Sequence, residues 1–314
     1  MEGEKGSSIL NRSGKNTEKN YVFTDWEGPW VLNDFAYELT LAIFNNDRFF
    51  QKLSEYDDYL FYVLKRKDYE AGYTLKLLVP FVSATGLGNV VEKLTPIFVP
   101  GAKKAGLILK RDCEVVIIST AYKKFVEKSA QEIGFERVHA SEVEFKMELD
   151  SDVRKMLLDS VDVIASLSGG ELYDFLDKLF SKFWESLKDL KVIGAREKAE
   201  ILESYAPDFP IAIGDSITDC KMFEKAKELG GVAIAFNGNK YALEKADLAI
   251  ISNSAMAEAL VVRELLKSGN YRALKSFRCR NAQIFLLEEA DFEKVLRASM
   301  KMRVKLRSAA GKLG

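Results

Sequence analysis

The sequence predicts an α/β fold in which helices flank a doubly wound parallel sheet, with a helical cap domain inserted after the first strand. Two observations predict the sheet: short apolar segments that do not alternate with polar residues, and helical patterns between them. A long helical block after the first of these segments predicts a separate helical domain inserted there. With 314 residues, 47% of them hydrophobic, the chain can bury such a core.

The expected core elements follow each other at short spacing. We expect buried strands at residues 21–24, 115–118, 211–213, 232–236 and 248–251. Periodic apolar residues predict helices between them, at 103–110, 122–133, 195–205, 219–229 and 240–245.

The chain divides into a core and several additions. We assign residues 21–30, 97–144 and 193–254 to the core, 31–96 to an aromatic-rich helical cap, 145–192 to a second helical insert and 255–314 to a C-terminal helical extension. Pro96 and Pro100 mark the return from the cap to the core. Residues 1–20 contain little to bury, so we expect a flexible tail there.

Composition excludes several classes of protein. The 46 Lys and Arg residues nearly balance 47 Asp and Glu residues, so we do not expect a nucleic-acid partner. Three widely spaced cysteines fit a reducing cytoplasm, and we expect no membrane span. Residues 263–312 are locally basic; we interpret them as a solvated amphipathic helix, with a surface that binds nucleic acid or an acidic partner as the alternative.

Acidic residues follow two of the expected strands. Asp25 comes directly after the first strand, and the carboxyl group of Glu27, two residues later, can lie at the same edge of the sheet. Asp215 stands at the tip of a later strand, and Asp219 comes four residues on. Carboxylates gathered at one edge repel each other unless a cation lies among them, and oxygen ligands favour Mg²⁺.

Other residues complete this predicted site. Ser119 and Thr120 end the strand before them, and either hydroxyl could face the site; strand alternation favours Ser119. Lys198 precedes the strand that leads to Asp215, and a lysine there could bind phosphate and keep Asp25 ionised.

These segments, FTDWEG, VVIIST, REKAEIL and IAIGDSITDCKMF, resemble the motifs of the haloacid-dehalogenase (HAD) superfamily of phosphohydrolases. FERVHASEVEF resembles the third strand of its phosphoserine-phosphatase branch, and residues 145–192 stand as an extra insert. The resemblance implies a Rossmann-like core and hydrolysis of a small phosphorylated metabolite.

The resemblance also implies roles for the site residues. Asp25 would attack phosphorus to form an aspartyl-phosphate, and Glu27 would act as acid and base. Ser119, Thr120 and Lys198 would hold the phosphoryl oxygens, a role in which the resemblance again favours Ser119 over Thr120. Mg²⁺ would be bound by Asp25, Asp215 and the backbone carbonyl of Glu27, with Asp219 close by or acting through water.

One departure from the family pattern leaves an alternative open. The family usually has aspartate where this chain has Glu27, and the longer side chain displaces the carboxyl by about one bond length. The alternative is a catalytically weak or inactive HAD-fold protein that serves as a binding or regulatory subunit. The cap or the C-terminal helices could also form an oligomer interface.

Overall fold

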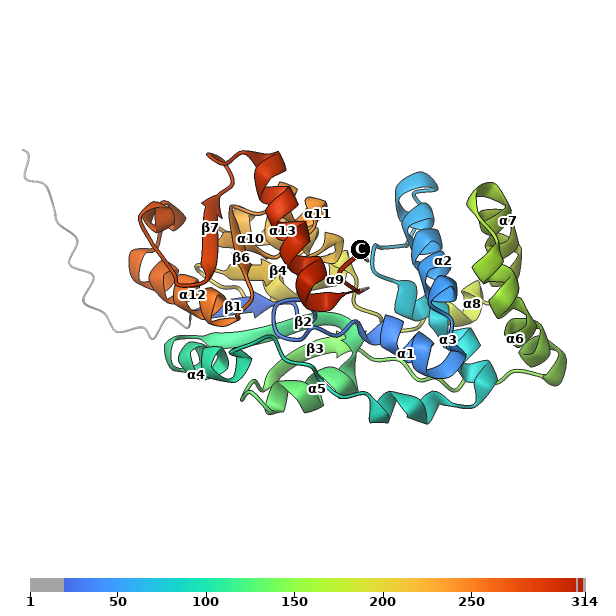
Figure 1. The fold of residues 1–314 in the computed structure, drawn as a ribbon. Coiled ribbons are helices and arrows are strands. Elements are labelled where there is room, and N and C mark those ends of the chain that lie inside the picture. The colour runs from blue at the N-terminus through green and yellow to red at the C-terminus, as the bar shows by residue number, and fades with distance from the viewer. Residues whose placement is uncertain (1–19, 309, 313–314) are drawn as a thin grey trace, which may run out of the picture.

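The computed structural model describes residues 20–308 and 310–312, so the tail expected at residues 1–20 lies, apart from Asn20, outside the described residues. Figure 1 shows a lobe built around the sheet and a second lobe made of helices. Within the described residues, no helix combines the length and the apolar character needed to cross a bilayer.

Within the described residues, the core sheet has seven strands in the order β3-β2-β1-β4-β5-β6-β7. Strands β1 to β6 pair in parallel, which confirms the predicted parallel sheet. Their side chains are largely buried, which explains why the sequence shows apolar runs without alternation. The strands are β1 (Tyr21–Thr24), β2 (Glu114–Tyr122), β3 (Arg137–Ser141), β4 (Ile211–Gly214), β5 (Val232–Phe236), β6 (Leu248–Ser252) and β7 (Ala282–Leu286).

Helices cover both faces of the sheet, as a doubly wound fold requires (Figure 1). One face packs against α9 (Ala195–Ser204), α10 (Cys220–Glu228), α11 (Lys240–Lys245) and α13 (Phe292–Arg307). The opposite face packs against α4 (Ala102–Asp112), α5 (Lys123–Gln131) and α12 (Met256–Ser268). Each predicted core helix is present, with ends that differ by a few residues.

The C-terminal region differs from its prediction. We expected helices throughout residues 255–314, but Ala282–Leu286 forms strand β7, which pairs antiparallel with β6. The prediction of helices alone is therefore wrong at this segment. An edge strand has a neighbour on one side only and stays half exposed, so a short segment can form it without the buried apolar run that marks the central strands.

The inserts form one helical lobe, which we call the cap (Figure 1). The first insert contains α1 (Phe35–Phe44), α2 (Asp47–Asp58), a π-helical turn (Tyr59–Val63), α3 (Thr74–Thr85) and a 3-10 segment (Gly88–Lys93). The second contains α6 (Ser151–Ser166), α7 (Gly169–Phe180) and the short α8 (Trp184–Leu187). The Tyr56 hydroxyl donates to Asp177 over 2.5 Å, and the rings of Tyr59 and Tyr173 stack with centroids 3.9 Å apart, so aromatic residues join the inserts.

Candidate active site

Asp25 lies where the topology of the sheet opens a crevice. From the central strand β1 the chain builds β2 and β3 on one side and β4 to β6 on the other, and ligands of such sheets bind at the carboxyl edge near this reversal. The Asp25 backbone N–H still donates to the Ile213 carbonyl over 2.9 Å, which fixes the residue at the end of β1. The N–H of Trp26 donates to Asp25 Oδ1 over 2.7 Å and fixes the carboxyl group.

Lys198 joins Asp25 to Asp219 in a buried charge cluster. Lys198 Nζ lies 2.9 Å from Asp25 Oδ2 and 2.7 Å from Asp219 Oδ1. Asp219 Oδ2 accepts the backbone N–H groups of Asp215, over 2.9 Å, and Ser216, over 3.0 Å. Burial raises the pKa of Asp25 to about 7, because the lowering by Lys198 offsets only part of the desolvation and of the repulsion from Asp219 and Asp215.

Glu27 has a second role at the start of helix α1. Its Oε1 accepts the backbone N–H of Phe35, the first residue of α1, over 2.6 Å. The longer side chain of glutamate therefore reaches a helix end, where N–H groups need acceptors. Burial raises the pKa of Glu27 well above its usual range; Asp34 adds to the increase, and Arg307 opposes it. A raised pKa favours the protonated carboxyl group that a general acid needs.

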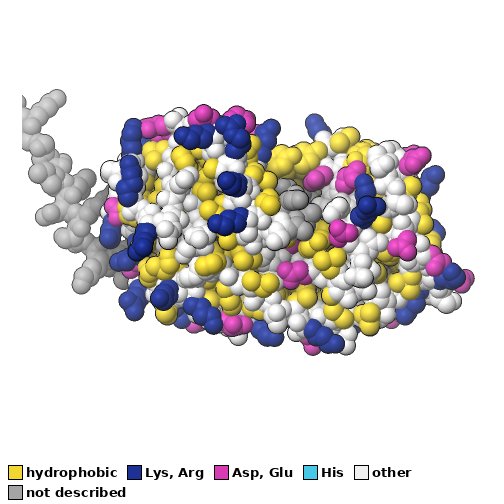
Figure 2. Space-filling model, viewed as in Figure 1, with side chains coloured by type: hydrophobic (Ala, Val, Ile, Leu, Met, Phe, Trp, Pro, Cys, Tyr) yellow, Lys and Arg dark blue, Asp and Glu magenta, His cyan; other side chains and the backbone are white. Residues whose placement is uncertain are grey.

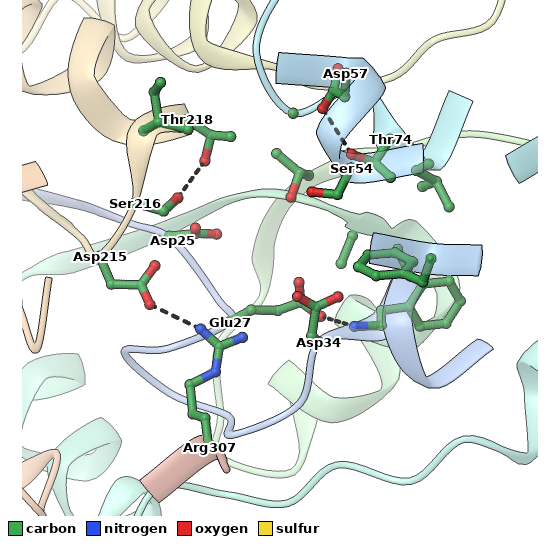
Figure 3. A pocket seen from close by; sticks show the side chains of 18 of the residues that line it. Asp25, Glu27, Asp34, Ser54, Asp57, Thr74, Asp215, Ser216, Thr218 and Arg307 are labelled. Carbon is green, nitrogen blue, oxygen red and sulfur yellow. Dashed lines mark hydrogen bonds and ion pairs between the residues drawn. The ribbon is translucent and has the colours of Figure 1, made fainter. Parts of the chain in front are cut away.

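A pocket separates these residues from the cap (Figure 3). Asp25, Glu27 and Asp215 line it from the core, and Ser54 and Thr74 line it from the cap. Figure 3 shows the cap side chains facing the carboxylates across the pocket. Polar groups from both lobes thus meet around one pocket, as in many small-molecule sites.

Direct contacts hold the cap to the core beside the pocket. Lys221 of α10 lies 2.7 Å from Glu70 of the cap. The hydroxyl of Tyr73 donates to Glu197 of α9 over 2.8 Å. These contacts fix the position of the cap relative to the core.

The structure distinguishes the two hydroxyls at the end of β2. Thr120 lines the pocket, whereas the fully buried Ser119 accepts the N–H of Ala121 at its Oγ over 3.2 Å. The register of β2 against β3 shifts between Ser119 and Tyr122, so simple alternation does not hold at this end of the strand.

The carboxylates of Asp25, Asp215 and Asp219 fit a hard divalent cation. Each is buried, and one oxygen from each lies within 4.8 Å of the others. Oxygen donors at such spacing suit Mg²⁺. Both oxygens of Asp219 already accept the hydrogen bonds described above, so its geometry favours a supporting position beside Asp25 and Asp215.

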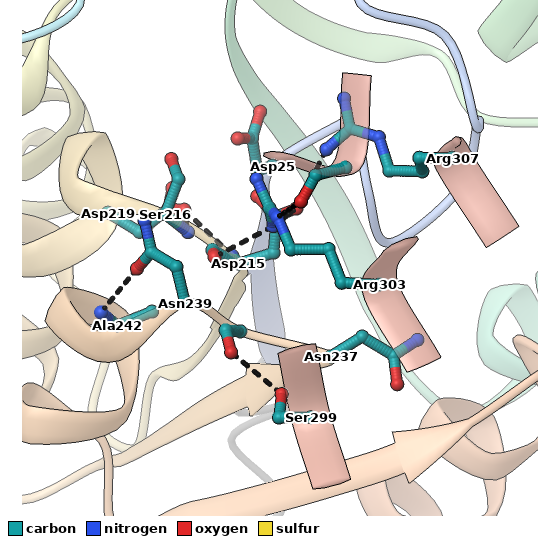
Figure 4. A network of polar contacts seen from close by, with 12 residues as sticks. Asp25, Asp215, Ser216, Asp219, Asn237, Asn239, Ala242, Ser299, Arg303 and Arg307 are labelled. Atoms are coloured by element: carbon teal, nitrogen blue, oxygen red, sulfur yellow. Dashed lines mark hydrogen bonds and ion pairs between the residues drawn. The ribbon is translucent and has the colours of Figure 1, made fainter. Parts of the chain in front are cut away.

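Sequence reasoning missed Arg303 and Arg307, which also line the pocket. Figure 4 shows them in the polar network around Asp215. Both guanidinium groups contact the Asp215 carboxylate. Interpreting residues 263–312 as a solvated helix is wrong for these side chains, which are 3% and 6% exposed. Their spacing of four residues places them on one helix face, but nothing local indicates that the helix returns to the sheet edge. On the face shown in Figure 2, other Lys and Arg side chains are interspersed with Asp and Glu.

Comparisons with known proteins place this geometry in a family. No protein-family model and no curated protein matches the chain. The solved structure of gene product AF1437 from Archaeoglobus fulgidus is 47% identical, with a TM-score of 0.90 over 94% of this chain and 99% of that one. A structure described as a phospho-aspartyl intermediate analogue of phosphoserine phosphatase has a TM-score of 0.50 at 19% identity, covering 80% of this chain and 98% of that one. The chain therefore belongs to the family of the Archaeoglobus fulgidus protein, and it has the HAD fold of the phosphoserine-phosphatase type.

Proposed function

We propose that the protein is a Mg²⁺-dependent phosphomonoester hydrolase that acts on a small cytoplasmic metabolite through an aspartyl-phosphate at Asp25. The observation that carries this proposal is the position of Asp25, which borders the pocket between core and cap and is paired with Lys198 at 2.9 Å. The fold adds support, since a structural neighbour is described as a phospho-aspartyl intermediate analogue.

The proposed reaction has two halves. First, a carboxylate oxygen of Asp25 bonds to phosphorus while the bond to the leaving oxygen breaks, and Glu27 gives its proton to that oxygen. Then ionised Glu27 takes a proton from water, the water oxygen bonds to phosphorus, and the bond between phosphorus and Asp25 breaks. Phosphate leaves, with Asp25 ionised and Glu27 protonated as at the start.

The remaining residues hold charge in place. Lys198, Thr120 and Ser119 are the proposed contacts for phosphoryl oxygens, with Thr120 the one at the pocket wall. Asp25, Asp215 and the backbone carbonyl of Glu27 are the proposed ligands of Mg²⁺, with Asp219 beside them. A bound Mg²⁺ would screen the phosphoryl charge from Asp25.

A panel of phosphorylated metabolites and aryl phosphates tests the proposal. Phosphate release should require Mg²⁺, stop with a chelator and be lost in Asp25→Asn, a nearly isosteric change that keeps the oxygen facing the Trp26 N–H. Circular dichroism of the variant checks that it is folded. Release that persists in Asp25→Asn would refute the proposal.

The contact of Arg303 and Arg307 with Asp215 favours a second candidate, a HAD-fold binding or regulatory subunit with weak or no catalysis. In that case the pocket would bind phosphorylated ligands without turnover. Binding of panel members, measured by calorimetry and unaccompanied by phosphate release at any Mg²⁺ concentration, would select this candidate.

A further inference from the structure

Helix α13 brings positive charge to Asp215. Arg307 Nη1 lies 3.0 Å from Asp215 Oδ2, and Arg303 contacts the same oxygen. Arg303 Nη1 also donates to the Asp215 backbone carbonyl over 3.1 Å. Figure 4 shows both guanidinium groups converging on Asp215 from one side of the site.

Backbone carbonyls fix these guanidinium groups. Arg307 donates from Nε to the Leu32 carbonyl over 3.2 Å and from Nη2 to the Asn33 carbonyl over 2.8 Å. Arg303 Nε donates to the Gly311 carbonyl over 3.2 Å. These backbone partners already hold the planar guanidinium groups in place. The arginine side chains therefore lose little further conformational entropy when they pair with Asp215.

The helix itself is anchored over the sheet edge. Ser299, one turn before Arg303, donates from Oγ to the Gly238 carbonyl over 2.7 Å. Val295, one turn earlier, is buried against the sheet. The buried side of α13 therefore leads directly to the arginines.

The formal charges of the six groups that form ion pairs here already cancel. Asp25, Asp215 and Asp219 can carry three negative charges, and Lys198 with the arginine pair carries three positive charges. A divalent cation held by Asp25 and Asp215 would add two positive charges next to guanidinium groups that already contact Asp215. Like charges at such distances oppose each other strongly in a buried site.

We propose that Arg303 and Arg307 are positioning residues that act as a resident cation for Asp215, and that a divalent metal ion must compete with them for this carboxylate. The inference rests on the proposed function in one respect, the assignment of Asp215 as a metal ligand. It predicts a metal affinity limited by the C-terminal helix.

Binding of Mn²⁺, used as a spectroscopic probe, tests the inference on the full chain. Free Mn²⁺ is measured by electron paramagnetic resonance during titration of wild type, Arg307→Gln and Arg307→Lys. Arg307→Gln removes the charge but keeps an N–H donor for the loop carbonyls, and it should bind Mn²⁺ roughly tenfold more tightly or better. Arg307→Lys keeps the charge and should stay within a few-fold of wild type.

Controls connect the affinity to this site. Arg297 is an exposed arginine on the same helix, and Arg297→Gln should leave Mn²⁺ affinity unchanged. Asp215→Asn should abolish the binding. Unchanged or weaker Mn²⁺ binding in Arg307→Gln would overturn the inference.

A measurement on wild type covers the case in which Arg307→Gln does not fold. If Mn²⁺ displaces the arginines, saturating Mn²⁺ should speed amide hydrogen exchange at residues 303–308 and leave exchange in α12 unchanged. Slower exchange at 303–308, or no change, would overturn the inference. Tighter Mn²⁺ binding without any phosphate release would refute the hydrolase proposal alone, whereas Mg²⁺-dependent release with unaltered Mn²⁺ affinity would refute this inference alone.

Discussion

Replacing Lys198 with Met should leave the Asp25 and Asp219 carboxylates without the charge that they share. Lys198 Nζ lies 2.9 and 2.7 Å from them, and all of these side chains are at most 5% exposed. Removing one partner of a buried ion pair costs about 3–5 kcal/mol, because the other charge stays buried and uncompensated. We expect a loss of that order in the free energy of unfolding.

The loss should grow with pH. The folded-state pKa of Asp25 is already raised to about 7 from 3.8. The wild type therefore loses stability as the pH rises from 3.8 to about 7, and above that pH Asp25 causes no further loss. Without Lys198 the pKa rises further, so the variant keeps losing stability at higher pH. Each additional pKa unit adds about 1.4 kcal/mol to the difference between the proteins.

Urea unfolding at pH 6 and pH 9, followed by circular dichroism, measures both effects. The matched control is Lys225→Met, whose lysine is 25% exposed and pairs with Glu203 and Glu228 at the surface. Such pairs contribute about 0–1 kcal/mol, so the control should change little. A loss below about 1 kcal/mol for Lys198→Met at both pH values would refute the reasoning.

Other buried carboxyl groups give further predictions. Burial raises the pKa of Asp57 to about 7 from 3.8. Between pH 5 and 7 the free energy of unfolding of the wild type should therefore fall by about 2–3 kcal/mol more than that of Asp57→Asn. An equal pH dependence of the two unfolding free energies across that range would contradict this. Within the described residues, neither carboxylate oxygen of Glu258 has a hydrogen-bond partner. Glu258→Met should therefore raise the melting temperature at pH 8, and a lower one would count against this account. Glu27→Gln cannot transfer a proton, so turnover should fall about 100-fold or more for alkyl phosphates and less for aryl phosphates with good leaving groups; equal losses would argue against an acid role.

The sheet and much of the site could be predicted because their signals are local. Strands buried on both faces must be apolar throughout, and the predicted segments 21–24 and 232–236 coincide with β1 and β5. Because parallel strands end at one edge, Asp25 and Asp215 could be expected to lie together. The structure brings them together and places Lys198, which the sequence also predicted for this site, beside Asp25.

Features that depend on distant parts of the chain could not be predicted in this way. Which hydroxyl at the end of β2 lines the pocket, that of Ser119 or that of Thr120, depends on a register shift between β2 and β3. The sequence of the strand gives no visible sign of this shift. Whether Arg303 and Arg307 face water or Asp215 depends on how α13 docks on the sheet. Likewise, the two inserts pack into one lobe through contacts between residues far apart in sequence, such as Tyr56 and Asp177.

The identity of the residue that takes up phosphate tests the central claim most directly. Wild-type protein is mixed with Mg²⁺ and either acetyl phosphate or a substrate found in the panel, quenched in acid and mapped by peptide mass spectrometry. The account predicts a phosphoryl group on Asp25, sensitive to hydroxylamine as an acyl phosphate is, and absent from Asp25→Asn. Turnover without any phosphorylated Asp25, or a phosphoryl group on another residue, would contradict it.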